Sequence, residues 1–174
     1  IVSLLMRAAT VSTSGDWMAN REASDVLVAP RMDDIEIRNW KAYDPDVAAG
    51  SEAMREALGP DVDMMLDIHR RLAPMHAIEL SKRLEEYEIY WFEEPCQAEN
   101  IEAIAEVRAK TRIPVMTGEN IFTKAGFRPV FERRAADIIN PDVTICGGIL
   151  ELLEIAAMAE PFFVAVSPHN YNST

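Results

Sequence analysis

Residues 89–95, Ile-Tyr-Trp-Phe-Glu-Glu-Pro, form an apolar run that ends in two carboxylates and a proline. Four other short apolar runs likewise end in a residue that can bind a metal or transfer a proton. They occupy residues 62–67, 113–119, 137–142 and 164–169. Such runs, with few polar interruptions, are typical of parallel strands that are buried on both faces. The sequence therefore predicts five strands, each with a reactive group at its carboxyl end.

The reactive residues recur at nearly constant intervals. From Asp67 to Glu93, Glu119, Asp142 and His169, the steps are 26, 26, 23 and 27 residues. A strand of about five residues, a helix of about twelve and two short loops fill such a step. The repeat therefore predicts β/α units. In a (β/α)8 barrel, the carboxyl ends of the strands converge on the face that carries the active site.

Helical patterns fill the intervals between the predicted strands. Apolar side chains recur at helical spacing after each strand but the last. The patterns begin near Met75, after Asn100, near Phe122 and after Gly147-Gly148. We expect Asn100 to cap the second of these helices, because its side chain can accept a hydrogen bond from the first turn.

The length of the chain limits how much of a barrel it can form. Its 174 residues are enough for one core, but a complete barrel usually needs about 200 residues or more. We assign residues 34–174 to a partial barrel of about strands 2 to 7, with a strand at residues 35–38 and a helix from Asp44 or Asp46 to about Leu58. Residues 1–33 stay unassigned, as a remnant of a capping domain or a first barrel unit. We expect a fragment of a larger enzyme.

Composition and charge exclude several classes of function. The net charge of −12 and the pI of about 4.7 argue against nucleic acid and anionic membranes, which require basic patches. The two cysteines, Cys96 and Cys146, are far apart in sequence, so we expect no disulfide framework and a reducing cytoplasm. The apolar residues 1–6 are too short to cross a membrane and lack the flanks of a signal peptide.

Three of the strand-end residues, Asp67, Glu93 and Glu119, are carboxylates that a barrel would bring together. Three like charges repel one another in a low dielectric, and a hard divalent cation relieves that repulsion. Oxygen ligands favour Mg²⁺ over zinc, with Mn²⁺ as the alternative cofactor. The competing interpretation of each acid alone is a solvated loop residue or a helix cap.

Two histidines are candidates for proton transfer. His169 follows the fifth strand, and Asp142, one unit earlier, can bind its other ring nitrogen and so fix the tautomer. His69 lies two residues after Asp67, so its side chain leaves the strand on the same face. Either histidine alone can also be a structural residue.

Other motifs have simpler interpretations. Arg70 and Arg71 can bind a substrate carboxylate, although surface arginines are the commoner case. Cys96 and Cys146 lack neighbours that would activate a thiolate. Gly147-Gly148 can hold a phosphate at a helix start, but we favour a plain turn.

The combined motifs resemble the enolase superfamily, in its mandelate racemase-like branch. The similarity extends from about residue 59 to residue 170. The matching pieces are Asp67-Ile68-His69, Trp91-Phe92-Glu93-Glu94-Pro95, residues 114–120, Asn140-Pro141-Asp142 with Cys146-Gly147-Gly148, and Ser167-Pro168-His169. The resemblance implies an enzyme that removes the proton alpha to a carboxylate, giving an enediolate that Mg²⁺ stabilises.

The resemblance also implies a role for each matching residue. Asp67, Glu93 and Glu119 would bind the metal, and His169, paired with Asp142, would be one acid/base. Glu94 would lie behind these ligands, and Arg70 and Asn120 would either bind the substrate or also lie behind the ligands. The Asp-x-His motif is similar to the galactonate dehydratase-type acid-sugar dehydratases, in which the histidine matching His69 is the general acid. The reaction would then eliminate water from a sugar acid to give a 2-keto-3-deoxy acid.

The sequence departs from the branch in two respects, and alternatives therefore remain. Racemases of this branch carry Lys-x-Lys, where Glu36-Ile37-Arg38 stands here, and the acid on the eighth strand would follow Thr174. One alternative is a racemase, epimerase or cycloisomerase of the same superfamily. The other is a non-catalytic barrel fragment that only associates with other subunits. Family members commonly form homo-oligomers, and we expect the same of the full-length enzyme.

Overall fold

The computed structural model describes residues 50–170, and the chain divides into two compact units, Ile1–Asp61 and Val62–Thr174. In the first unit the described residues form a helix over 50–58. Gly59 ends this helix as predicted, with φ of 76° and its N–H donating to the carbonyl of Arg55 at 3.0 Å. The strand expected at 35–38, the helix start at Asp44 or Asp46, and the boundary at residue 33 lie outside the described residues.

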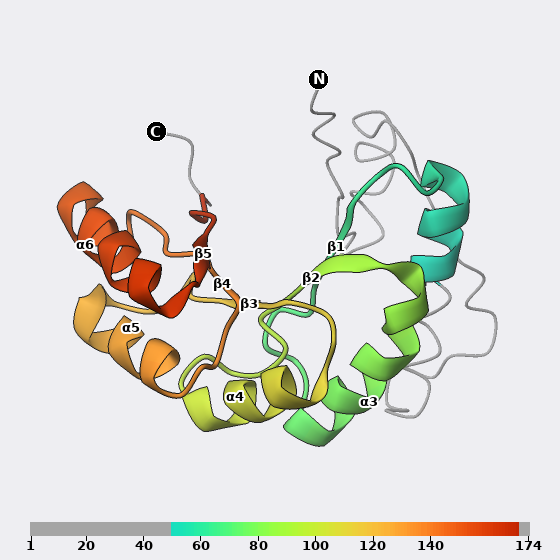
Figure 1. Cartoon of the computed structure of the whole chain (residues 1–174), viewed down its shortest axis with the longest axis horizontal. Coiled ribbons are helices and arrows are strands. Elements are labelled where there is room, and N and C mark those ends of the chain that lie inside the picture. Colours follow the sequence, from blue (N-terminus) through green and yellow to red (C-terminus); the bar gives the residue numbers. More distant parts are fainter. Residues whose placement is uncertain (1–49, 171–174) are drawn as a thin grey trace, which may run out of the picture. The chain divides into compact units, whose positions relative to one another are not determined.

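The second unit contains a parallel sheet whose strands follow one another in chain order (Figure 1). The strands are β1 (Met64–Asp67), β2 (Ile89–Glu93), β3 (Val115–Thr117), β4 (Ile138–Ile139) and β5 (Ala165–Val166). Each lies inside one of the five predicted apolar runs, which confirms the predicted strands.

One helix follows each of the first four strands. The helices are α3 (Pro74–Leu84), α4 (Ile101–Lys110), α5 (Thr123–Glu132) and α6 (Ile149–Ala159), with the short 3-10 helices η1 (Glu85–Tyr87) and η2 (Glu160–Phe162). Successive helices contact one another, α3 with α4, α4 with α5 and α5 with α6. Figure 1 shows them along one side of the strands. Parallel strands in chain order, with the helices on one side, form part of a (β/α) barrel wall rather than a doubly wound sheet.

Local sequence explains where these helices begin. The Asn100 side chain accepts a hydrogen bond from the N–H of Ala103 at 3.0 Å, so the predicted cap of α4 is confirmed. Gly148 precedes α6 with φ of 99°, a conformation that favours glycine, and the Gly147-Gly148 pair is the turn that we favoured. Among residues 50–170, no helix is both long and apolar enough to cross a membrane.

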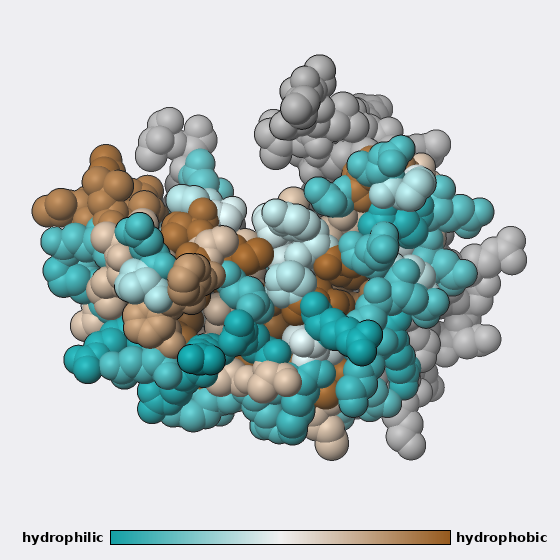
Figure 2. All heavy atoms as spheres, viewed as in Figure 1, coloured by the Kyte–Doolittle hydropathy of each residue, from teal (hydrophilic) through white to brown (hydrophobic). Residues whose placement is uncertain are grey.

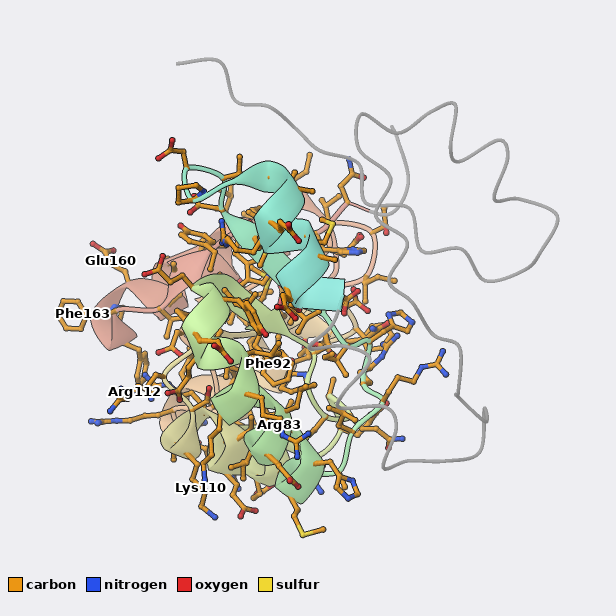
Figure 3. All side chains as sticks on the ribbon, turned by 90° about the vertical axis from the view of Figure 1, so that its right-hand side faces the viewer. Arg83, Phe92, Lys110, Arg112, Glu160 and Phe163 are labelled. Carbon is orange, nitrogen blue, oxygen red and sulfur yellow. The ribbon has the colours of Figure 1, made fainter. Side chains whose placement is uncertain are left out.

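The core lies between the sheet and the helices. Phe92 of β2 is fully buried, and so is Phe127 of α5. In Figure 3, Phe92 lies inside the domain, whereas Lys110 and Phe163 extend outward. Every residue of β3 is buried, as expected for a strand that is covered on both faces. The same expectation is wrong for β1 and β2, in which Met65 is 54% and Tyr90 is 50% exposed.

The register of the strands aligns their carboxyl ends. Asp67 of β1 pairs with Glu93 of β2, and Glu93 pairs in turn with Met116 of β3. Beyond the ends of β4 and β5, Asp142 and His169 form an isolated parallel bridge. Because all five strands are parallel and in register, the predicted reactive residues emerge at one edge of the sheet.

Gly118 lets the chain turn at the end of β3. Its φ is 136°, and a Cβ atom built on it would lie 2.8 Å from Cε1 of Phe127 and 3.3 Å from the backbone nitrogen of Asn140. The Phe127 ring is fully buried and cannot withdraw without disturbing the core. The close packing of α5 against the strand that leads to Glu119 therefore depends on a glycine at position 118.

We expect Gly118→Ala to lower the free energy of unfolding by about 1–3 kcal/mol or more, because it combines overpacking with an unfavourable φ. Urea unfolding followed by circular dichroism measures this change. Gly50→Ala is the matched control: it has nothing within 4 Å and lies in a helix, so it should be neutral or stabilising by up to about 1 kcal/mol. Equal stability of the Gly118→Ala protein and the parent would contradict the role assigned to Gly118.

Candidate active site

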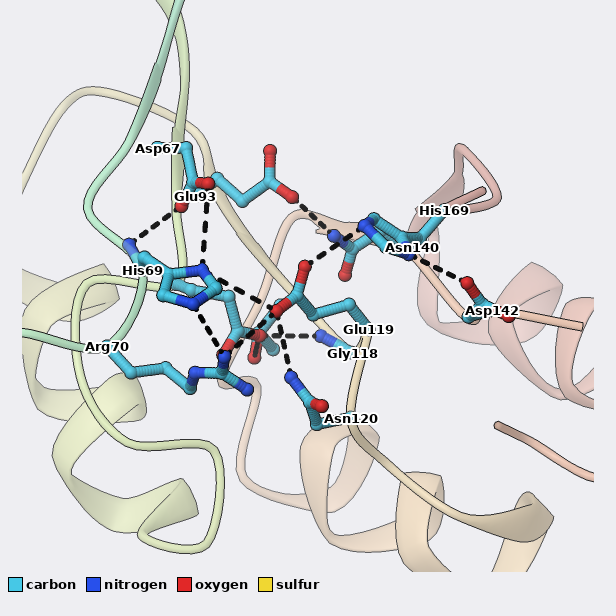
Figure 4. Close-up of polar contacts among 12 residues, drawn as sticks. Asp67, His69, Arg70, Glu93, Gly118, Glu119, Asn120, Asn140, Asp142 and His169 are labelled. Carbon is cyan, nitrogen blue, oxygen red and sulfur yellow. Dashed lines mark hydrogen bonds and ion pairs between the residues drawn. The ribbon is translucent and has the colours of Figure 1, made fainter. Parts of the chain in front are cut away.

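The predicted site residues meet at the carboxyl ends of the strands (Figure 4). Asp67 and Glu93 end β1 and β2, and Glu119 lies two residues after β3. The view also includes His69, Arg70, Asn120, Asp142 and His169, which come from the loops after the strands. The structure thus brings together residues that are up to 102 positions apart in the chain, from Asp67 to His169.

Glu93 lies between neighbouring negative charges and is held by neutral donors. Its Oε2 accepts a hydrogen bond from Nε1 of Trp91 at 3.2 Å, and its Oε1 accepts one from Nδ2 of Asn140 at 2.7 Å. Burial, and then the charge of Asp67, raise the pKa of Glu93 to about 7, with a smaller contribution from Glu119. A carboxylate whose pKa is raised by neighbouring carboxylates lies in a site that would favour a cation.

Glu119 is nearly buried and is surrounded by hydrogen-bond donors and cationic groups. Its Oε1 accepts a hydrogen bond from Nδ2 of Asn120 at 2.8 Å and lies 3.4 Å from Nη2 of Arg70. Its Oε2 lies 3.2 Å from Nε2 of His169. Asn120 and Arg70, which we expected either to bind the substrate or to lie behind the ligands, contact Glu119 in this structure.

Glu94 contacts the two residues that precede Glu119 and supports the end of β3. It is fully buried, and its Oε1 accepts hydrogen bonds from Oγ1 of Thr117 at 2.5 Å and from the N–H of Gly118 at 2.9 Å. Burial raises the pKa of this carboxyl group. The Glu94 side chain thus fixes the backbone immediately before Glu119, which agrees with a place behind the expected ligands.

His169 and Asp142 form the predicted pair. Nδ1 of His169 lies 2.8 Å from Oδ2 of Asp142, whose other oxygen accepts hydrogen bonds from the N–H and the Oγ1 of Thr144 at 2.7 and 2.6 Å. A carboxylate can only accept, so Nδ1 carries a hydrogen, and Nε2, 3.2 Å from the Glu119 carboxylate, carries one only in the imidazolium form. Nε2 faces Glu119.

His69 approaches the same carboxylates from the β1 side. Nη2 of Arg70 donates to Nε2 of His69 at 3.1 Å, and because a guanidinium cannot accept, that nitrogen has no hydrogen. The hydrogen of the neutral ring is therefore on Nδ1, which lies 4.0 Å from Oδ2 of Asp67 and 3.9 Å from Oε1 of Glu119. The two histidines thus turn different nitrogens toward Glu119: Nδ1 of His69 and Nε2 of His169.

The backbone around these residues adopts an uncommon conformation. His69, Arg70 and Glu94 have φ values of 52°, 65° and 42°, in the left-handed region that non-glycine residues seldom enter. The N–H of Arg70 donates to the carbonyl of Glu94 at 2.7 Å, so the two loops support each other. Each such residue costs about 1–3 kcal/mol, and this kind of strain clusters at functional sites.

The three carboxylates fit a divalent cation by the chemistry of their atoms. Among residues 50–170, no three histidine, cysteine, aspartate or glutamate side chains are close enough together to enclose a metal ion. Asp67, Glu93 and Glu119 nevertheless present only oxygen ligands, and after burial the charges of Asp67 and Glu119 contribute to the raised pKa of Glu93.

Sequence reasoning missed several residues that shape the site. Asn140, Trp91, Thr117 and Thr144 each donate a hydrogen bond to one of the functional carboxylates. Trp91 alone had a usable signal, because it lies two residues before Glu93 and so on the same face of the strand. Both cysteines are free, and burial raises the pKa of Cys96 to about 11 and also raises that of Cys146, so neither is an activated thiolate.

The model of the enolase C-terminal domain-like family matches residues 19–174. The chain belongs to this family. A D-galactonate dehydratase from Ralstonia pickettii is 40% identical over 129 residues, which are 74% of this chain and 34% of the relative. A D-xylonate dehydratase from Haloferax volcanii is 36% identical over 122 residues, 70% of this chain and 30% of the relative. The chain spans about a third of the length of these curated relatives.

Solved structures have the same fold. The 3,6-anhydro-D-galactonate cycloisomerase from Zobellia galactanivorans matches with a TM-score of 0.73 and 33% identity, over 75% of this chain and 37% of its own. An enolase from Bradyrhizobium, complexed with magnesium and mandelic acid, matches with a TM-score of 0.72 and 34% identity, over 74% of this chain and 36% of its own. The predicted membership of the enolase superfamily and the partial barrel are therefore confirmed.

Proposed function

We propose that this chain carries the acid–base site of a Mg²⁺-dependent acid-sugar dehydratase. The observation that carries the proposal is the presence of two proton-transfer groups around Glu119: the imidazole of His69 near Oε1 and that of His169 near Oε2. Removal of an alpha proton and protonation of a departing hydroxyl require two such groups. The similarity to D-galactonate and D-xylonate dehydratases supports the same reaction.

His169 would be the base. Asp142 holds Nδ1 and stabilises the imidazolium that forms, so that Nε2 takes the proton from the carbon alpha to the substrate carboxylate. The electron pair of that C–H bond then moves into the carboxylate. Thr144 fixes Asp142 through two hydrogen bonds and keeps the pair in position.

His69 would be the acid. As an imidazolium, it would protonate the hydroxyl on the neighbouring carbon and return to the neutral ring, while water leaves and the carbon–carbon double bond of an enol forms. The enol tautomerises to a 2-keto-3-deoxy acid. Nε2 of His69 accepts a hydrogen bond from Arg70 in this structure, so that contact would have to break before the ring takes up its second proton.

Asp67, Glu93 and Glu119 would hold the metal, with Mg²⁺ preferred and Mn²⁺ as a substitute. When bound, Mg²⁺ would supply Lewis-acid stabilisation of the charge that develops on the substrate carboxylate. The magnesium complex of the Bradyrhizobium structure supports this cofactor. The exposed His69 side chain, at 53%, leaves the β1 side of the site accessible to a small sugar acid.

A cycloisomerase or epimerase of the same superfamily is the second candidate, favoured by the similarity to the Zobellia galactanivorans cycloisomerase. Such an enzyme also removes an alpha proton but need not release water. The products therefore separate the two candidates.

The direct test is a screen of the purified protein against aldonic and aldaric acids with Mg²⁺, in which semicarbazide detects 2-keto products by absorbance. A hit would establish dehydration and identify the acid. If no keto acid forms, but deuterium from D₂O appears at C2 of an acid, the second candidate replaces the first. Absence of both products and exchange across the library would contradict both and favour a non-catalytic domain.

Glu119→Gln should weaken Mg²⁺ binding by about 100-fold or more. Loss of a residue that binds the metal should lower the affinity more than loss of a residue that only orients a ligand, which costs about 10–100-fold. Isothermal titration calorimetry measures the affinity. Glu106→Gln is the matched control, since Glu106 is an exposed helical residue paired with Lys110 at 2.7 Å, and it should leave binding unchanged. Unchanged affinity in a folded Glu119→Gln protein would remove Glu119 from the ligand set.

His169→Asn should slow exchange of the alpha proton by about 100-fold or more, the usual contribution of a general base. Proton NMR of the substrate in D₂O follows the exchange. His76→Asn is the matched control, because it changes the same residue type on α3, away from the site. This variant should catalyse exchange of the alpha proton at the parent rate. Exchange at the parent rate in the His169→Asn protein would assign the base to another residue.

A further inference from the structure

Asn140 connects two strands that are not neighbours in the sheet. It follows β4, yet its Nδ2 reaches Oε1 of Glu93 at the end of β2, at 2.7 Å. Strand β3 lies between them, and the N–H of Asn140 donates to the carbonyl of Thr117 on that strand at 3.2 Å. The backbone of Asn140 is therefore fixed to β3, while its side chain crosses the strand end to contact Glu93.

Glu93 receives one neutral donor on each oxygen, Trp91 on Oε2 and Asn140 on Oε1. Each carboxylate oxygen has two lone pairs, so one lone pair on each remains for a cation. The donors do not neutralise the carboxylate, but together they restrict its rotation. This pattern differs from that of Glu119, which contacts Arg70 and His169.

The oxygen of the Asn140 side-chain amide shows that the contact with Glu93 sets the orientation of this amide. Asn140 is 2% exposed, and its Oδ1 is buried without a hydrogen-bond partner among the described residues. Rotating the amide by 180° would direct Oδ1 at the Glu93 carboxylate, which can only accept. The contact with Glu93 therefore determines the orientation of the amide, although a buried unpaired oxygen is unfavourable.

We propose that Asn140 is a positioning residue that holds Glu93 in the rotamer that binds the metal. The inference rests on the proposed function only in taking Glu93 as a ligand of Mg²⁺. It assigns a role to a residue outside the predicted ligand and acid–base sets. Trp91 restrains the opposite oxygen, so the loss of Asn140 should loosen Glu93 without releasing it.

The test is Mg²⁺ affinity, measured by titration calorimetry on Asn140→Leu and Asn140→Ala. Both variants remove the donor, and we expect the affinity to fall about 10–100-fold, as for other residues that orient metal ligands. If the protein is active, saturating Mg²⁺ should restore most of kcat, because the ligands themselves are intact. Asn100→Ala is the matched control: it removes the cap of α4, away from Glu93, and should keep the parent affinity.

A measurement on the unsubstituted protein covers the case in which both variants fail to fold. With ¹⁵N-labelled asparagine, the side-chain amide resonances of Asn140 should shift on addition of Mg²⁺, whereas those of Asn100 should not. Parent-like affinity in a folded Asn140 variant, or no shift at Asn140, would overturn the inference. If Mg²⁺ binding depends on Asn140 but the protein dehydrates no acid, the proposed dehydratase function is wrong and the role of Asn140 still holds.

Discussion

The in-register pairing of Asp67 with Glu93 is the constraint on which the rest of the site depends. Parallel pairing places two carboxylates at adjacent strand ends, and Glu119 adds a third from the next strand. Burial and this repulsion raise the pKa of Glu93 to about 7. The surrounding residues compensate in two ways: neutral donors orient Glu93, whereas Arg70 and His169 contact Glu119.

The same arrangement gives the site its chemical asymmetry. His69 and His169 reach Glu119 from loops after the first and last described strands. Their partners fix the same Nδ1–H tautomer, but His69 turns Nδ1 and His169 turns Nε2 toward Glu119. The left-handed conformations of His69, Arg70 and Glu94 cost stability, which the buried strand β3 and the α5 core around Phe127 can offset. The stabilising core thus lies between the sheet and the helices, whereas the reactive residues lie at the carboxyl ends of the strands.

The sequence alone predicted the five strands and the residues at their ends, because both depend on local patterns: apolar runs, their spacing and the residue that follows each. It did not predict Asn140, since the contact of Asn140 with Glu93 crosses an intervening strand and depends on how far the sheet curves. Thr144 was missed for a related reason, because its contact with Asp142 depends on the turn after β4. The exposure of Met65 and Tyr90 was not predicted either, because an apolar run does not show which of its side chains other elements cover.

The most direct test of a metal site at the strand ends is a crystal structure of the protein grown with Mn²⁺, with anomalous diffraction recorded at the manganese edge. The account predicts one strong anomalous peak within about 2.0–2.4 Å of oxygens from Asp67, Glu93 and Glu119, since Mn²⁺ takes the same oxygen ligands as Mg²⁺. It also predicts that Asn140 still contacts Glu93. No peak at these carboxylates in saturating Mn²⁺, or a peak only elsewhere, would contradict the central claim.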